Sequence, residues 1–158
     1  MITPIIMLAL LSAPLLCAYF YSKARKKTLK VKPFAGFGLG IVFLFTAMGH
    51  FVKTAPMMEM LPPWVPAGEA LVYLTGIIEI VIGVGLFTAR YRRIAALAAI
   101  VTLFAFFPVN IYAAINHTGM GGHQWGPVYL WIRTPLQLVL IAWAWWFLLR
   151  VNRAGAEQ

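Results

Sequence analysis

Charged residues and cysteine are both scarce in this sequence. Asp, Glu, Lys and Arg make up 11% of its 158 residues, whereas soluble globular domains have about 25%. The one cysteine, Cys17, lies inside an apolar run, which excludes an intramolecular disulfide, a CxxC redox pair and a cysteine zinc site. A Gly-rich phosphate loop, an HExxH motif and a nucleophile elbow are also missing. The sequence therefore predicts neither a metal site nor a familiar catalytic centre.

Apolar residues, in contrast, are abundant and arranged in long runs. Hydrophobic residues make up 62% of the chain and the mean hydropathy is +0.84, which is more apolar surface than a soluble protein of this size could bury. Five runs are each long enough to cross roughly 30 Å of hydrocarbon as a helix. We therefore predict an all-α fold, a single transmembrane domain over residues 1–158 with helices at about 2–21, 34–52, 69–89, 94–115 and 130–149.

The basic residues predict the orientation of these helices. Eleven Lys and Arg residues lie in the segments on one side of the predicted membrane, and only Lys53 lies in the opposite loops. Because basic loops stay in the cytoplasm, we expect a membrane protein with its N-terminus outside and its C-terminus in the cytoplasm. The net charge of +9 then reflects topology, and nucleic acid is not an expected partner. The eleven residues are Lys23, Arg25, Lys26, Lys27, Lys30, Lys32, Arg90, Arg92, Arg93, Arg150 and Arg153.

Glu79 is a carboxyl group near the middle of the third predicted span. Insertion at that depth costs about 2.5–3.5 kcal/mol, so we expect Glu79 to face the bundle interior and to be neutral or paired. Arg133, near the outer end of the fifth span, is the cation within reach, and Gln137, one turn deeper, could bridge the remaining gap. Two interpretations stay open, a ligand-binding or proton-handling group and a structural hydrogen bond. Gly76 and Gly83 share the face of Glu79, which favours close approach of a neighbouring helix.

Two further polar residues lie near the same level of the membrane. Asn110 follows Pro108 in the fourth span, and a proline leaves a carbonyl one turn earlier without its helical donor. Polar side chains can satisfy such groups, which favours a structural role for Asn110. His50 ends the second span at the outer interface, and its imidazole can exchange a proton near neutral pH. Together the candidate ligand-binding residues are Glu79, Arg133, Gln137, Asn110 and His50.

A copper site is an alternative interpretation of the outer loops. Thioether and imidazole ligands suit Cu(I), and the outer side holds His50 together with Met57, Met58, Met60, His117, Met120 and His123. Their spacing matches no known metal motif. A haem is not expected, because the three histidines lie at or beyond the outer interface and none lies deep within a span.

Five stretches together resemble the DoxX-like family of small bacterial membrane proteins. They are residues 45–51, 61–66, 75–79, 107–110 and 133–137. The resemblance implies a four-helix core with Glu79, Asn110, Arg133 and Gln137 turned inward, so that the helix at about 2–21 is an addition. It also implies a location in the bacterial inner membrane and an association with quinone-linked or terminal-oxidase complexes.

These observations lead to several functional hypotheses. One is a site for a quinone or another small lipophilic ligand in a redox-linked membrane complex, and the alternative is a non-enzymatic assembly or structural subunit. A carrier for a small solute or proton is less favoured, since the sequence shows no repeat symmetry. Outer-face copper handling is also less favoured, since the ligand spacing matches no metal motif. No intrinsic cofactor and no autonomous enzyme is expected, at most a quinone-linked oxidoreductase component. The expected partners are the lipid bilayer, subunits of a redox complex, and a second copy of the chain.

Overall fold

The computed structural model describes residues 2–118 and 122–150, and these residues form helices and turns without any strand. The elements are α1 (Ile2–Ala24), α2 (Val31–Val52), α3 (Thr54–Met58), α4 (Gly68–Phe87), α5 (Arg92–Ile115), the 3-10 turn η1 (His123–Tyr129), α6 (Leu130–Trp143) and the π-helical η2 (Ala144–Leu149). Five helical stretches are long and apolar enough to cross a membrane, and the fifth joins η1, α6 and η2 into one span, His123–Leu149. The prediction of an all-α chain with five such helices is confirmed.

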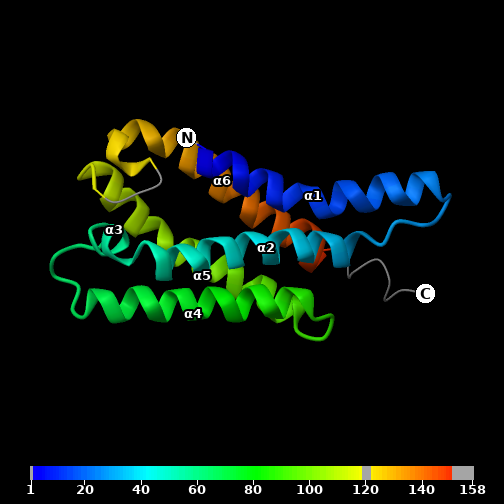
Figure 1. Cartoon of the computed structure of the whole chain (residues 1–158), viewed down its shortest axis with the longest axis horizontal. Coiled ribbons are helices and arrows are strands. Elements are labelled where there is room, and N and C mark those ends of the chain that lie inside the picture. The colour runs from blue at the N-terminus through cyan, green and yellow to red at the C-terminus, as the bar shows by residue number, and fades with distance from the viewer. Residues whose placement is uncertain (1, 119–121, 151–158) are drawn as a thin grey trace.

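The five long helices run back and forth, so their connections gather at two ends (Figure 1). The start of α1, helix α3 and the turn η1 lie at one end, which we call the α3 end. The α1–α2 and α4–α5 connections lie at the other, which we call the basic end. Among the described residues, the carboxyl groups of Glu59, Glu69 and Glu79 all lie outside the basic end. The described basic residues of that end are Lys23, Arg25, Lys26, Lys27, Lys30, Lys32, Arg90, Arg92, Arg93 and Arg150.

Helix α2 packs between α1 and α4, and glycines allow both close contacts. A Cβ atom at Gly38 would collide with the backbone of Leu11 in α1. On the other side, a Cβ atom at Gly40 would lie 3.0 Å from the carbonyl oxygen of Gly83, and one at Gly83 would lie 3.1 Å from that of Gly40. Gly76 of α4 packs likewise against His50. The predicted close approach along the Gly76–Gly83 face is therefore confirmed, and it turns Glu79 toward α2.

The apolar core extends from the middle of the bundle to the basic end. It consists of side chains from α1, α2, α4, α5, α6 and η2, including Leu11, Leu39, Val42, Leu86, Ala99, Leu140 and Leu148. Two long side chains close the basic end. The indole Nε1 of Trp143 donates to the carbonyl oxygen of Ala35 at 3.1 Å, and the guanidinium of Arg92 donates to the last carbonyl oxygens of α4, those of Leu86 and Phe87.

The connection between α5 and α6 differs from the sequence-based expectation of an outer loop over residues 116–129. Residues 123–129 form η1, which folds back onto the bundle and buries His123 and Tyr129. The turn depends on two glycines, because Gly122 has φ 115° and Gly126 has φ 77°, values that side chains with a Cβ atom rarely adopt. The His123 and Tyr129 rings pack edge to face with centroids 4.9 Å apart.

Candidate functional site

A cavity of about 590 Å³ lies between the helices near the α3 end. Its walls come from α1, α2, α4, α5, α6 and η1 and from residues of and after α3, so almost every element contributes. Most of the wall is apolar, with Phe45, Leu71, Phe106 and Val109 among its side chains. Met48 and Val52 also line the cavity and are exposed, so it reaches the surface of the bundle. The titratable groups on its wall are His50, Lys53, Glu79, His123, Tyr129 and Arg133.

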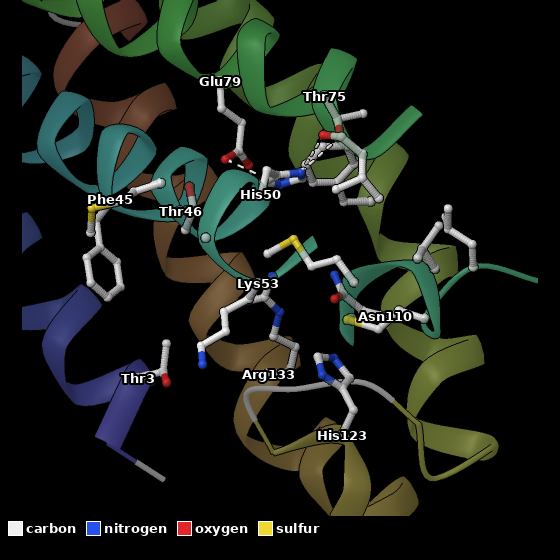
Figure 2. A pocket seen from close by; sticks show the side chains of 18 of the residues that line it. Thr3, Phe45, Thr46, His50, Lys53, Thr75, Glu79, Asn110, His123 and Arg133 are labelled. Atoms are coloured by element: carbon white, nitrogen blue, oxygen red, sulfur yellow. Dashed lines mark hydrogen bonds and ion pairs between the residues drawn. The ribbon is translucent and has the colours of Figure 1, made fainter. Parts of the chain in front are cut away.

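His50 connects α2 to α4 at the cavity wall, and Figure 2 shows its ring between Thr75 and Glu79. Its Nδ1 lies 2.9 Å from the carbonyl oxygen of Val72 and 3.1 Å from the Thr75 hydroxyl. That hydroxyl has its own proton directed to the carbonyl oxygens of Leu71 and Val72, both at 2.9 Å. Both neighbours of Nδ1 are therefore acceptors, and we infer that Nδ1 carries a hydrogen.

The other ring nitrogen of His50 faces Glu79. Nε2 lies 3.6 Å from Oε2 of the carboxyl group, and this oxygen is buried without a hydrogen-bond partner among the described residues. If Nε2 were unprotonated and the carboxyl group ionised, two lone pairs would face each other in a buried site. A proton on either atom removes this repulsion. We infer that the pair is neutral overall and holds one proton between its two members, as imidazolium and carboxylate or as imidazole and carboxylic acid.

This arrangement differs from the expectation that Glu79 would find its partner in Arg133 through Gln137. His50, which comes from the end of α2, is the ion-pair partner within 4 Å. Gln137 does not line the cavity, and its amide Nε2 donates instead to the carbonyl oxygen of Leu103 in α5 at 2.7 Å. Leu103 lies next to Phe104, whose carbonyl oxygen is the one that Pro108 leaves without its helical donor. The Gln137 amide therefore binds one residue before the carbonyl that the proline frees.

Arg133 lies on the cavity wall without a carboxylate partner at ion-pair distance among residues 2–118 and 122–150. Its Nε is buried and makes no hydrogen bond to the described residues. Glu79 is close enough for their charges to interact at longer range. Lys53 lines the same cavity, and Figure 2 shows its amino group directed toward Thr3 of α1. With His50 and Glu79 neutral as a pair, Arg133 and Lys53 leave the wall positively charged.

Asn110 also lines the cavity and is buried, at 5% exposure. Its side chain, from α5, lies across the cavity from Thr46 of α2, whose hydroxyl donates to the carbonyl oxygens of Val42 and Phe43 (Figure 2). Four of the five candidate residues, His50, Glu79, Asn110 and Arg133, thus share one cavity, and Gln137 lies outside it. The cavity wall also includes Lys53, Thr75 and Tyr129, which the sequence does not predict as site residues. Thr75 lies one turn before Glu79 on α4, a spacing that could have indicated it.

Four of the seven candidate copper ligands line the cavity. Met57 and Met60 line the cavity together with His50 and His123, whereas Met58 does not. The ring of His117 packs on Gly126, with Nδ1 at 3.4 Å from the carbonyl oxygen of Gln124. Met120 lies outside the described residues. Within the part of the chain that the structure describes, no three His, Cys, Asp or Glu residues are grouped so that they could hold a metal ion.

Comparison with known proteins gives one match. A family model described as a domain of unknown function (DUF8561) matches residues 39–148. The matched range begins within α2 and ends within η2. It therefore contains every charged group of the cavity wall and leaves out α1. No curated protein and no solved structure matches the chain.

Proposed function

Because the chain belongs to the DUF8561 family, whose description assigns no activity, we propose its function from the cavity: the protein binds a small lipophilic molecule with a polar head, such as a quinone, within the membrane. The observation that carries this proposal is the cavity itself. Ligand sites are typically concave, largely apolar spaces of about 300–1,000 Å³ with a few converging polar groups. At about 590 Å³, with mainly apolar walls and one polar cluster, the cavity has these properties.

The polar cluster suits a head group that accepts hydrogen bonds. Arg133 has donor groups without a carboxylate partner at ion-pair distance among the described residues. A quinone carbonyl oxygen, or an oxygen that gains negative charge, accepts hydrogen bonds from a guanidinium. The His50–Glu79 pair holds a proton on the same wall and could exchange it with the ligand. Gln137, which binds Leu103, takes no part in this set.

The protein holds its ligand for a redox partner in this proposal. The resemblance to the DoxX-like family supports a place beside quinone-linked or terminal-oxidase subunits, with the redox step carried out by those subunits. The protein is then a binding component with no cofactor of its own. The distribution of basic residues, eleven against one, supports an inner-membrane orientation with the N-terminus outside, the basic end in the cytoplasm and the cavity in the outer half.

A structural subunit is the second candidate function, and interhelical hydrogen bonds favour it. His50 joins α2 to α4 through Val72, and Gln137 joins α6 to α5 through Leu103. In lipid, such bonds contribute to helix association. Under this alternative the polar residues would act only on packing, so every substitution among them would lower stability.

Ligand binding by purified protein in detergent tests the proposal. Quinone binding is measured for the wild type and for Arg133→Leu and Glu79→Gln. We expect Arg133→Leu to weaken binding about tenfold or more, since hydrogen bonds to charged groups contribute about 1.5–3 kcal/mol. Glu69→Gln at an exposed carboxyl and Gln137→Leu outside the cavity are the matched controls, and both should bind as the wild type does. Wild-type binding no stronger than the detergent background would refute the proposal.

A further inference from the structure

A second hollow, separate from the cavity, lies on the surface of the bundle near the basic end. This groove has a volume of about 540 Å³ and is almost entirely apolar. One wall is a stripe of α1 at helical spacing, and the other is a stripe of α2, with Phe87 of α4 beside it. The lining residues are Pro14, Cys17, Ala18 and Tyr21 from α1 and Phe34, Phe37 and Ile41 from α2.

Aromatic rings give the groove a fixed wall. The Phe37 ring packs edge to face against Phe34, with centroids 5.9 Å apart, and against Phe87 at 5.8 Å. Helices α1 and α2 are held together by the contact of Gly38 with the Leu11 backbone. Two helices packed this closely have a groove between their outward faces. Its apolar surface suits a hydrocarbon chain.

Residues 23–32, which we call the 23–32 connection, comprise the turn between α1 and α2 with the helix ends beside it, and they carry the densest positive charge of the protein. The connection begins two residues after Tyr21 and ends two residues before Phe34, so the charge stands at the end of the groove. Its six basic residues are Lys23, Arg25, Lys26, Lys27, Lys30 and Lys32. None of them forms an ion pair within the part of the chain that the structure describes. The described carboxyl groups all lie outside the basic end, so no carboxylate among the described residues neutralises these cations.

We propose that the groove is a binding site for an anionic phospholipid, with an acyl chain between α1 and α2 and the phosphate against the 23–32 connection. A phospholipid joins the two required properties in one molecule, an apolar chain and an adjacent negative charge. Basic residues next to a membrane helix attract anionic head groups. The groove itself is apolar and does not discriminate among lipids, so selectivity comes from the connection. The groove and the ligand cavity have no lining residue in common.

Native mass spectrometry of the full chain in detergent tests the selectivity. The protein is incubated with phosphatidylglycerol or with phosphatidylcholine of identical acyl chains at equal concentration. We expect at least about fivefold more bound phosphatidylglycerol, and a smaller difference at high salt because the charges are screened. Equal retention of the two lipids would overturn the proposal. This comparison uses the unmodified protein and does not depend on the folding of a variant.

The contribution of the connection is tested by removing its charge. Lys27→Gln, Lys30→Gln and Lys32→Gln combined should reduce phosphatidylglycerol retention to the phosphatidylcholine level. The matched control, Lys27→Arg, Lys30→Arg and Lys32→Arg combined, keeps the charge and should retain the preference. Unchanged selectivity in the glutamine variant would contradict a head-group site on this connection.

Cys17 reports on the groove itself, because it is the one cysteine of the chain and lines the groove in an exposed position. Phosphatidylglycerol should slow alkylation of Cys17 by N-ethylmaleimide several-fold more than phosphatidylcholine does. In the glutamine variant the two lipids should act equally. Selective lipid binding without any effect on Cys17 would place the lipid elsewhere and overturn the acyl-chain site.

Discussion

The Nε2 atom of His50 faces the Oε2 atom of Glu79 across 3.6 Å, and the two residues come from neighbouring helices, α2 and α4. The opposite ring nitrogen is fixed by Val72 and Thr75, so the ring cannot turn away without losing those contacts. The buried carboxyl group of Glu79 thus has a partner, His50, that can itself exchange a proton. Together the two side chains carry no net charge. When such a pair passes its proton to a bound molecule, a neutral imidazole and a carboxylate remain, so the pair is left with one negative charge on the wall that also carries Arg133.

The His50–Glu79 pair should be energetically coupled. His50→Phe and Glu79→Met each leave a polar partner buried, so each should lower the free energy of unfolding by about 1–3 kcal/mol. The double variant should lose less than the sum of the two, because it leaves neither partner behind. Unfolding in mixed detergent micelles provides the double-mutant cycle. Effects that add within about 0.5 kcal/mol would show that the two residues act separately.

Arg133→Leu should leave stability unchanged or raise it slightly. The guanidinium has no carboxylate at ion-pair distance among the described residues, and replacing a poorly paired buried charge by an apolar side chain is often neutral or stabilising. The measurement is the same unfolding titration, run beside the quinone-binding assay. Loss of binding with intact stability fits a ligand site. A large loss of stability would favour the structural-subunit function.

Gln137→Leu should have the opposite profile. Its amide donates to the carbonyl oxygen of Leu103 at 2.7 Å. Removing the amide leaves that carbonyl without this donor, which should lower the free energy of unfolding by about 1–3 kcal/mol. Stability should fall while quinone binding stays at the wild-type level, since Gln137 does not line the cavity. Weakened binding at unchanged stability would show that the amide reaches the ligand.

Gly83→Ala should destabilise the contact between α2 and α4. The added methyl group would lie 2.9 Å from Cγ of Leu44 and 3.1 Å from the carbonyl oxygen of Gly40, so we expect a loss of about 1–3 kcal/mol. Gly68→Ala is the matched control, because its methyl group would lie at an ordinary 3.4 Å from Leu61. Similar melting temperatures for the two variants would contradict close packing of these helices.

The proposed orientation predicts which ends can be labelled from outside the cell. In a Cys17→Ser background, Glu69→Cys at the α3 end should react with a membrane-impermeant maleimide in whole cells. Thr88→Cys at the basic end should react only after the membrane is permeabilised. Both positions are exposed, so access to the reagent differs only by side of the membrane. The reverse labelling pattern would show that the protein has the opposite orientation in the membrane.

The helices could be predicted from the sequence, whereas the partner of Glu79 could not. Hydrophobic runs of sufficient length identify five spans, because the bilayer sets a minimum length for a helix. The Gly76–Gly83 face was also predictable, because helical spacing puts small residues on one side. His50 was placed at the interface and Glu79 near mid-membrane. Whether the two side chains come into contact depends on the axial offset between α2 and α4, which hydropathy does not specify.

Gln137 shows a related limit. Its face on α6 was predictable from its spacing to Arg133, but its acceptor is a backbone carbonyl of α5. Every residue has such a carbonyl, so the sequence does not single out Leu103. The buried position of His123 was also missed, because η1 depends on the positive φ angles of Gly122 and Gly126. Glycine permits such turns without specifying the direction of the chain that follows.

Helix α2 contributes to both hollows of the protein. Phe34, Phe37 and Ile41 line the groove at one end, and Thr46 and His50 line the cavity at the other. At 22 residues, the helix is about 33 Å long, and its glycine contacts hold it against α1 and α4. A helix of this kind moves as a rigid unit, so a displacement at one end also displaces the other. A shift of α2 caused by one occupant would therefore alter the fit of the other, so that the lipid composition of one leaflet would tune the affinity of a site in the opposite leaflet.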